Sequence, residues 1–434
     1  MTRDLASNWT NNAIGRIRRA LGNARGTTET DPQRGDVPLA FDPLAAEFML
    51  DPYPTFRALR ERDPVHRSPM GAWVLTRYDD VLTALADPRV GNAPSRHAVV
   101  NGRNRHRYVA ADVANNIIPF LDEPHHAAPR RLISRAFRTQ LRRRPPDIAG
   151  IAQQLLEATH DRSEIDVVRD YARPLSVAVL CHLLGISEED EERLTEWSVW
   201  FFYLFSVIPS EEIRRQLDES LVEFRDYFRR AIEEKRRSPR DDLISAMITA
   251  GEAEAGLSDT EIADTCMLLF ADGVENVDAA VGNAVAALLD HPNELARLRA
   301  DPTLLPSAVD ECLRFETPAL FIGRVALAPL SIRGTSIPAQ SAILLMLGSA
   351  NRDPMQFTDP DRLDLGRRPN THLSFGKGRH SCVGGRLVRL EMRIALGALL
   401  ESLPEWIPVE GERHWEARLG HRWLSQLRLR TYRG

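Results

Sequence analysis

Residues 374–385 read "SFGKGRHSCVGG", in which four glycines surround a single cysteine, Cys382. A cysteine binds metals as its thiolate, and a lone thiolate needs surroundings that hold it ionised. Glycines let the backbone approach a sulfur closely and permit positive φ. A helix is predicted from about Gly384 to Leu403, and its N-terminal end carries partial positive charge. The segment therefore favours a thiolate that is stabilised by backbone N–H groups.

Two other uses of Cys382 fit the sequence less well. A zinc site takes several nitrogen or sulfur ligands, and no second cysteine lies nearby. A nucleophilic cysteine needs a paired base, and His380 lies two residues away, where an extended chain gives no direct contact. A single thiolate in a glycine-lined loop is typical of an axial ligand to haem iron.

The stretch from Phe375 to Gly384 resembles the haem-binding loop of the cytochrome P450 family, Phe-Gly-x-Gly-x-His-x-Cys-x-Gly, at every fixed position. The resemblance implies heme b, with its iron bound by Cys382. It also implies that Phe375, Gly376, His380 and Gly384 contact this cofactor. It extends from about residue 41 to the end of the chain.

The hydrophobic pattern favours the same fold class. Most segments after residue 118 repeat apolar residues with the period of a helix, and short strand-like runs follow residue 318. We therefore expect a mainly α fold with a small β portion, formed as a single large domain over 41–434. Residues 1–40 form a polar N-terminal extension, either disordered or a short helix. The polar stretch 92–118 is predicted to be a long loop of the kind that often binds ligands.

The amino-acid composition of the chain argues against several classes of protein. The chain has 434 residues, 43% of them hydrophobic, and a net charge of −5. This allows a large core, and the mild acidic balance argues against nucleic-acid binding. The four cysteines form no CxxC pair, which indicates a reduced, intracellular protein. Without a signal peptide or a long apolar run, we expect a soluble, cytoplasmic protein that has no membrane anchor.

Further matches to the family lie outside the loop. Glu311 and Arg314 stand one helical turn apart and resemble the structural ion pair behind the haem, so we expect a role in folding rather than chemistry. Haem propionates need cationic or polar donors. The residues that fall on the propionate positions are His126, Arg130, Arg324 and His380. His125 competes with His126 for one of these positions.

The longest helix, predicted from about Ser258 to Asp290, departs from the family pattern at its centre. The family shows Ala-Gly-x-Glu/Asp-Thr, whereas this chain has Asp272-Gly273-Val274-Glu275-Asn276. The resemblance implies that Glu275 feeds protons toward bound oxygen. An amide donates and accepts hydrogen bonds but relays protons poorly, so Asn276 is expected to anchor a water molecule and hold the distal oxygen.

Asp272 permits two interpretations. An acid that faces the haem in an apolar pocket is costly unless it is paired, so it could bind a hydroxyl or an amine of the substrate. Alternatively, it turns away from the haem and pairs within the protein. Asp272, Glu275 and Asn276 are the candidate catalytic residues.

The resemblance predicts a monooxygenase that inserts one oxygen atom from O2 into a small or medium organic substrate, and tailoring of a secondary metabolite such as an antibiotic. Its electrons would come from NAD(P)H through a ferredoxin reductase and a ferredoxin. Seven arginines in "PRRLISRAFRTQLRRR" (129–144) form either a solvated face or the docking face for that ferredoxin. The sequence leaves open a carrier-tethered substrate, and two rival functions: oxidative coupling or N-oxidation, and haem binding without catalysis.

Overall fold

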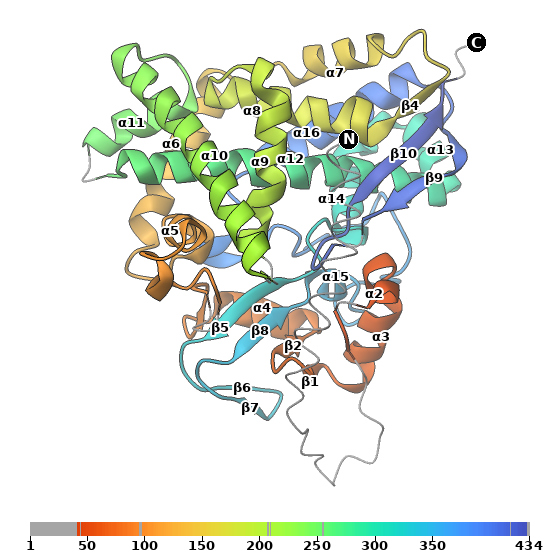
Figure 1. The fold of residues 1–434 in the computed structure, drawn as a ribbon. Coiled ribbons are helices and arrows are strands. Elements are labelled where there is room, and N and C mark those ends of the chain that lie inside the picture. The colour runs from red at the N-terminus through yellow and green to blue at the C-terminus, as the bar shows by residue number, and fades with distance from the viewer. Residues whose placement is uncertain are drawn as a thin grey trace.

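The helix α12 (Asp259–Asp290) runs through the centre of the molecule, as Figure 1 shows. The computed structural model describes residues 41–43, 45–94, 98–205, 208, 210–253, 256–416 and 418–431. Ser258 and Glu261 form the capping box that begins α12, because each side chain bonds the other residue's backbone N–H. Most of its residues between Ile262 and Leu288 are buried, which explains why the helix is apolar on nearly all sides.

Helices make up most of the fold. Besides α12 they are α2 (Ala46–Leu50), α3 (Tyr53–Arg62), α4 (Tyr78–Ala86), α5 (Val109–Ala114), α6 (Ala127–Arg143), α7 (Ile148–Glu157), α8 (Arg173–Leu184), α9 (Glu191–Phe201), α10 (Glu211–Arg237), α11 (Leu243–Ala253), α13 (Pro292–Ala300), α14 (Leu305–Phe315), α15 (Leu347–Ala350) and α16 (Gly385–Ser402). The predicted helices around Ser258–Asp290 and Gly384–Leu403 are confirmed to within a residue at each end.

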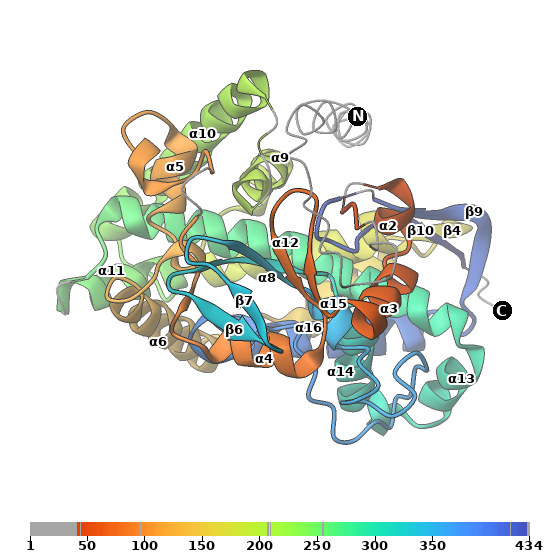
Figure 2. The same cartoon turned by 90° about the horizontal axis from the view of Figure 1, so that it is seen from below.

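The strands form three small sheets. They are β1 (Val65–Arg67), β2 (Trp73–Leu75), β3 (Val90–Gly91), β4 (Glu164–Asp166), β5 (Ile322–Ala326), β6 (Leu330–Ile332), β7 (Thr335–Ile337), β8 (Ala342–Leu345), β9 (Ile407–Trp415) and β10 (Leu424–Arg430). One sheet has the order β1-β2-β8-β5-β3, another the order β4-β10-β9, and β6 pairs with β7. Figure 2 shows the β4-β10-β9 sheet well apart from the β6–β7 hairpin. The expected mainly α fold with a small β portion in one domain is confirmed.

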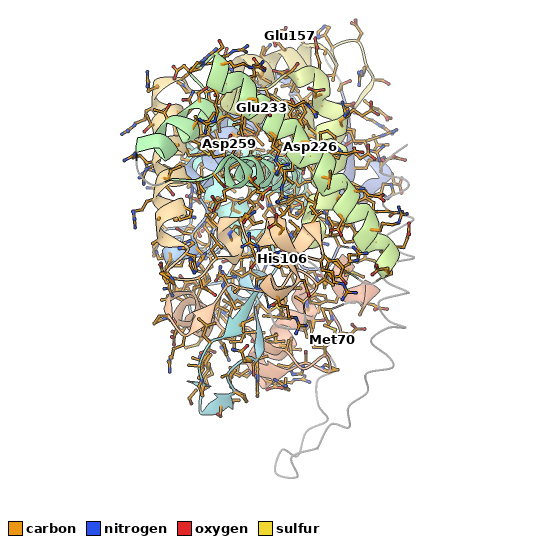
Figure 3. The ribbon with its side chains drawn as sticks, turned by 60° about the vertical axis from the view of Figure 1, so that its left-hand side comes forward. Met70, His106, Glu157, Asp226, Glu233 and Asp259 are labelled. Atoms are coloured by element: carbon orange, nitrogen blue, oxygen red, sulfur yellow. The ribbon has the colours of Figure 1, made fainter. Side chains whose placement is uncertain are left out.

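The prediction of a long loop over 92–118 is wrong in part. The segment contains the short helix α5, in which the backbone N–H of Ala110 donates to the Asp218 carboxylate of α10 at 2.8 Å. Tertiary contacts therefore stabilise a helix too short to be recognised from its own sequence. Figure 3 shows α10, with Asp226 and Glu233 labelled, above the segment that carries His106.

An arginine joins this segment to the core. Arg225 of α10 donates to both carboxylate oxygens of the fully buried Asp264 of α12, at 2.6 and 2.7 Å. It also donates to Asp112 of α5 at 3.0 Å. Three helices far apart in the sequence thus meet at one guanidinium. Within the described residues, no helix is both long and apolar enough to cross a bilayer.

Candidate active site

Cys382 lies at the end of a tight loop, directly before α16. Gly376 and Gly378 adopt φ of 64° and 75°, a left-handed conformation that favours glycine. The backbone N–H of Cys382 donates to the carbonyl of Phe375 at 2.8 Å, which folds the loop back on itself. Of the four free cysteines, Cys382 alone is exposed; the other three are buried. The loop therefore presents one accessible thiol.

Some groups around this thiol raise its pKa and others lower it. Enclosure by the protein raises the pKa of Cys382 to about 11, and the charge of Asp272 adds to the shift. Backbone N–H groups of Gly384 and Gly385, together with the Arg130 guanidinium, lower the pKa and offset part of it. These N–H groups favour the thiolate, as the sequence predicts, but a bound metal is needed to hold it, because coordination deprotonates a thiol.

The other loop residues pack closely around the sulfur. A Cβ placed on Gly384 would lie 3.9 Å from the Cys382 sulfur. The Phe375 ring lies against Gly385, where an added Cβ would be 3.4 Å from it, and the Arg389 guanidinium is 4.5 Å from its centroid. Phe375 therefore fixes the loop onto the first turn of α16.

The four predicted propionate-binding residues come together from three parts of the chain. The rings of His126 and His380 lie 3.9 Å apart between centroids, and Arg130 donates to the carbonyl of Ser381. Burial lowers the pKa of His380 to about 3, and the nearby His126, Arg324, Arg379 and Arg130 lower it further. Burial likewise lowers the pKa of Arg324, on β5, to about 10. Both imidazoles are therefore neutral near pH 7, and the positive charge of this cationic cluster comes from Arg130 and Arg324.

The structure distinguishes His126 from its competitor. His126 is buried, with 2% of its surface exposed, and faces His380, whereas His125 is exposed. The Nε2 atom of His126 is buried without a hydrogen-bond partner. A buried polar atom inside a cationic cluster indicates the place of an anionic ligand.

The thiol and the cationic cluster together fit haem. Within the residues that the structure describes, no group of three or more His, Cys, Asp or Glu side chains could hold a bare metal ion. A metal bound by Cys382 must therefore bring other donors with it, as a porphyrin does. The two carboxylates of a haem would pair with the cationic cluster and add to the partial compensation that Glu123 and Asp122 give it.

Asp272 and Asn276 of α12 form a pair one helical turn apart. The Asn276 side-chain nitrogen donates to the Asp272 carbonyl at 3.1 Å and to its Oδ1 at 2.7 Å. Both N–H groups of the amide are thereby used. The Asn276 nitrogen is therefore engaged by Asp272 while its side-chain oxygen remains an acceptor, and the expected role of holding the distal oxygen stays a prediction. Asp272 is exposed although most of α12 is buried, and its charge raises the pKa of the Cys382 thiol.

Glu275 has a partner that sequence reasoning missed. It is fully buried, and its Oε2 lies 3.4 Å from the Arg418 guanidinium in the connection between β9 and β10. Arg418 in turn lies 4.0 Å from the Trp423 ring centroid and 5.0 Å from that of Phe202. The other Glu275 oxygen, Oε1, has no partner. No local pattern signals a contact across 143 residues.

Glu311 and Arg314 perform the predicted structural role. Both are fully buried, and Arg314 donates to both Glu311 oxygens at 2.8 Å. Arg314 also donates to the carbonyls of Asn351 and Pro360, while Arg367 donates back to Glu311. The pair therefore holds the irregular segment 351–370 that leads to the cysteine loop.

The arginines of α6 divide into two sets. Arg130 turns inward to the cysteine loop. The exposed arginines on and just after the helix are Arg131, Arg135, Arg138, Arg142, Arg143 and Arg144. Because α6 also carries Arg130, this basic face borders the side of the site on which Cys382 lies.

The chain was compared with known proteins. The family model described as Cytochrome P450 matches residues 95–414. The chain is 33% identical over 393 residues to a biotin biosynthesis cytochrome P450 of Bacillus subtilis, covering 90% of this chain and 98% of that protein. It is also 33% identical over 383 residues to the polyketide biosynthesis cytochrome P450 PksS of the same organism, covering 85% and 92%.

The fold has a solved counterpart. The structure of P450BioI in complex with an acyl carrier protein ligated to hexadec-9Z-enoic acid superposes with a TM-score of 0.83 at 32% identity. It covers 89% of this chain and 100% of that chain. Members of the matched family bind haem through a cysteine thiolate and use O2, an organic substrate and redox partners. The chain therefore belongs to the cytochrome P450 family and is a haem-thiolate monooxygenase.

Proposed function

We propose that this protein inserts one oxygen atom from O2 into a small or medium organic molecule, as a tailoring step in the synthesis of a secondary metabolite. The observation that carries the proposal is the joint placement of the Cys382 thiol and the cationic cluster of His126, Arg130, Arg324 and His380. The relative named for polyketide biosynthesis supports the metabolic role.

In this proposal Cys382 holds the iron and the cationic cluster holds the propionates. When bound, haem supplies the chemistry of oxygen activation. Phe375, Gly376 and Gly384 shape the loop so that the backbone can approach the sulfur. Arg130 joins the cluster to the loop through its bond to Ser381, so α6 and the loop position the cofactor together.

Proton handling falls to the polar groups of α12. Glu275 Oε1 is a buried acceptor without a partner, which suits an internal water molecule. Asn276 offers its amide oxygen to a second water, since its N–H groups are bonded to Asp272. We assign Glu275 as the residue that holds the transferable proton, with Asn276 and Asp272 orienting water beside it.

The exposed arginines of α6 support the assignment of an acidic ferredoxin as electron donor. A basic face next to the cysteine side of the site accelerates encounter with an acidic partner, and salt screens that attraction. We expect the rate of reduction by ferredoxin to fall several-fold between low and high ionic strength. Arg138→Glu should reproduce this loss at low salt, whereas Arg237→Glu, at the end of α10, should not. If the rate of reduction changed neither with salt nor in Arg138→Glu, the proposal that ferredoxin docks on this face would be contradicted.

The central test is a carbon-monoxide difference spectrum of the reduced, haem-loaded protein. We expect the long-wavelength Soret band of a thiolate-ligated complex. Cys382→Ser should lose that band together with NAD(P)H-driven oxygenation, while Cys312→Ser, at a buried cysteine, should keep both. A parent spectrum without the thiolate band in folded protein would overturn the proposal. Free and carrier-tethered substrates should then be compared by product analysis.

A further inference from the structure

Four acids lie in the largely buried stretch of α12, and Asp272 differs from the other three in its partner. Three have an arginine partner, namely Asp264 with Arg225, Glu275 with Arg418, and Asp278 with Arg173. Asp272 forms no ion pair with any residue in the described part of the chain; its partner is the neutral amide of Asn276. The negative charges of the other three acids are thus compensated by arginines, whereas the charge of Asp272 is not.

The orientation of Asp272 is fixed by Asn276. One amide N–H bonds the Asp272 carbonyl and the other bonds its Oδ1, so the carboxylate is tied to its own helix turn. Oδ2 accepts no hydrogen bond from the described residues, and the residue is exposed although its neighbours Ala271 and Val274 are fully buried. One oxygen of this exposed carboxylate is therefore left as an acceptor without a partner among the described residues.

The carboxylate lies on a face of α12 that stays partly open, since Asp272 is exposed and Leu269 and Asn276 keep part of their exposure. The charge of Asp272 raises the pKa of the Cys382 thiol, so the two groups lie within electrostatic reach of each other. The next residue, Gly273, packs against α8, where an added Cβ would be 2.7 Å from Leu180. The open part of this face therefore lies beside Asp272 and Asn276.

The charge balance favours a cation over a neutral partner. Although the side chain keeps exposed surface, the surrounding protein removes much of its solvation, which raises the pKa of Asp272 to about 6, and only the Asn276 bond counters this. A neutral hydroxyl would leave that charge uncompensated, whereas an ammonium group both donates a hydrogen bond and neutralises it. Each of the other three acids is paired with the positive charge of an arginine, and Asp272 has no such partner among the described residues.

We propose that Asp272 Oδ2 binds a protonated amine of the substrate, so that this monooxygenase selects organic molecules bearing a basic nitrogen. Asn276 is the positioning residue that holds the carboxylate toward the ligand. The inference rests on the proposed function, because it assigns the substrate class of the same site. Its test uses ligand binding and does not depend on turnover.

The experiment titrates the haem-loaded protein with matched ten-carbon probes and follows the spin-state shift of the Soret band. The probes are N,N-dimethyldecylamine, decan-1-ol and decanoate. We expect the amine to bind about tenfold tighter than the alcohol, as suits one partly buried charge pair, and decanoate to bind most weakly. Asp272→Asn should remove the preference for the amine and leave decan-1-ol binding unchanged. Asp290→Asn removes one charge from the far end of the same helix and should change nothing.

Several results would overturn the inference. They are equal amine binding by the parent and Asp272→Asn, tighter binding of the alcohol than of the amine, no amine binding by the parent, and a shift that reports direct amine ligation of the iron. Should Asp272→Asn fail to fold, Asn276→Ala provides the test, since it keeps the charge, loosens its orientation, and should weaken amine binding more than alcohol binding. The thiolate band in the carbon-monoxide spectrum tests the proposed function separately.

Discussion

Glu311 on α14 and Glu275 on α12 are both fully buried carboxylates, but their hydrogen-bonding capacity is used very differently. Glu311 accepts bonds from Arg314, Arg367 and Asn370, which occupy both of its oxygens. Glu275 has one contact of 3.4 Å and one oxygen without a partner. A carboxylate whose bonds are all used holds the fold together, whereas one with unused capacity is available for chemistry.

Of the changes predicted here, breaking the hydrogen-bond network around Glu311 should have the largest effect. Arg314→Leu removes a buried ion pair and the bonds to the segment 351–370, so we expect a loss of about 3–5 kcal/mol in the free energy of unfolding. Denaturant unfolding of the haem-loaded protein measures it. The control is Arg57→Leu at the exposed pair with Asp361, 2.7 Å apart, where we expect about 1 kcal/mol or less. Equal losses in both variants would contradict the structural role.

Changing Glu275 should affect turnover and leave stability largely unchanged, which is the opposite of what we expect for Arg314→Leu. We expect Glu275→Gln to slow turnover about a hundredfold, which is typical of losing a proton-transfer group, while stability changes little. The measurements are kcat with saturating reductant, peroxide release and denaturant unfolding. If unfolding free energy fell as in Arg314→Leu while kcat stayed the same, the contrast between the two carboxylates would be wrong.

The cationic cluster offers a smaller test on the cysteine side. Arg130→Ala removes the guanidinium that bonds Ser381, and we expect haem to dissociate about tenfold faster, as for groups that support a metal ligand. Haem transfer to an apo-haem acceptor protein measures this rate. Arg138→Ala, on the exposed face of the same helix, should leave it unchanged. A similar rate in both variants would remove Arg130 from the cofactor site.

The smallest effect concerns Arg225, whose two acids differ in burial. The side chain of Asp264 is fully buried, whereas that of Asp112 is 30% exposed. We expect Asp112→Asn to loosen α5 and raise the association rate of a ligand severalfold, without measurable loss of stability. Stopped-flow measurement of the Soret shift provides the rate. An unchanged rate with lowered stability would show that Asp112 only supports the fold.

Local patterns predicted the parts of the site that lie close together in sequence. The cysteine loop, the Glu311–Arg314 turn and the boundaries of α12 each depend on contacts within one or two helical turns. The fold class followed from the helical period of the hydrophobic residues.

Other parts could not be predicted because their partners are distant in sequence. The Glu275–Arg418 contact depends on how the β9–β10 hairpin packs against α12. The helix α5 is stabilised by Asp218 of α10, 108 residues away from Ala110. The Asp272–Asn276 pair was within reach, since residues four apart on a helix are neighbours, but the direction of the amide only emerges from the geometry.

The double attachment of Arg225 bears on how α5 could move away from α12. If α5 moves away, Arg225 loses Asp112 but keeps both bonds to Asp264, so the motion leaves no buried charge without a counter-ion. Asp112 keeps a salt bridge to Arg105 within its own segment. Arg225 therefore does not oppose such a motion, although the Ala110–Asp218 and Asn116–Asp264 bonds would still have to break.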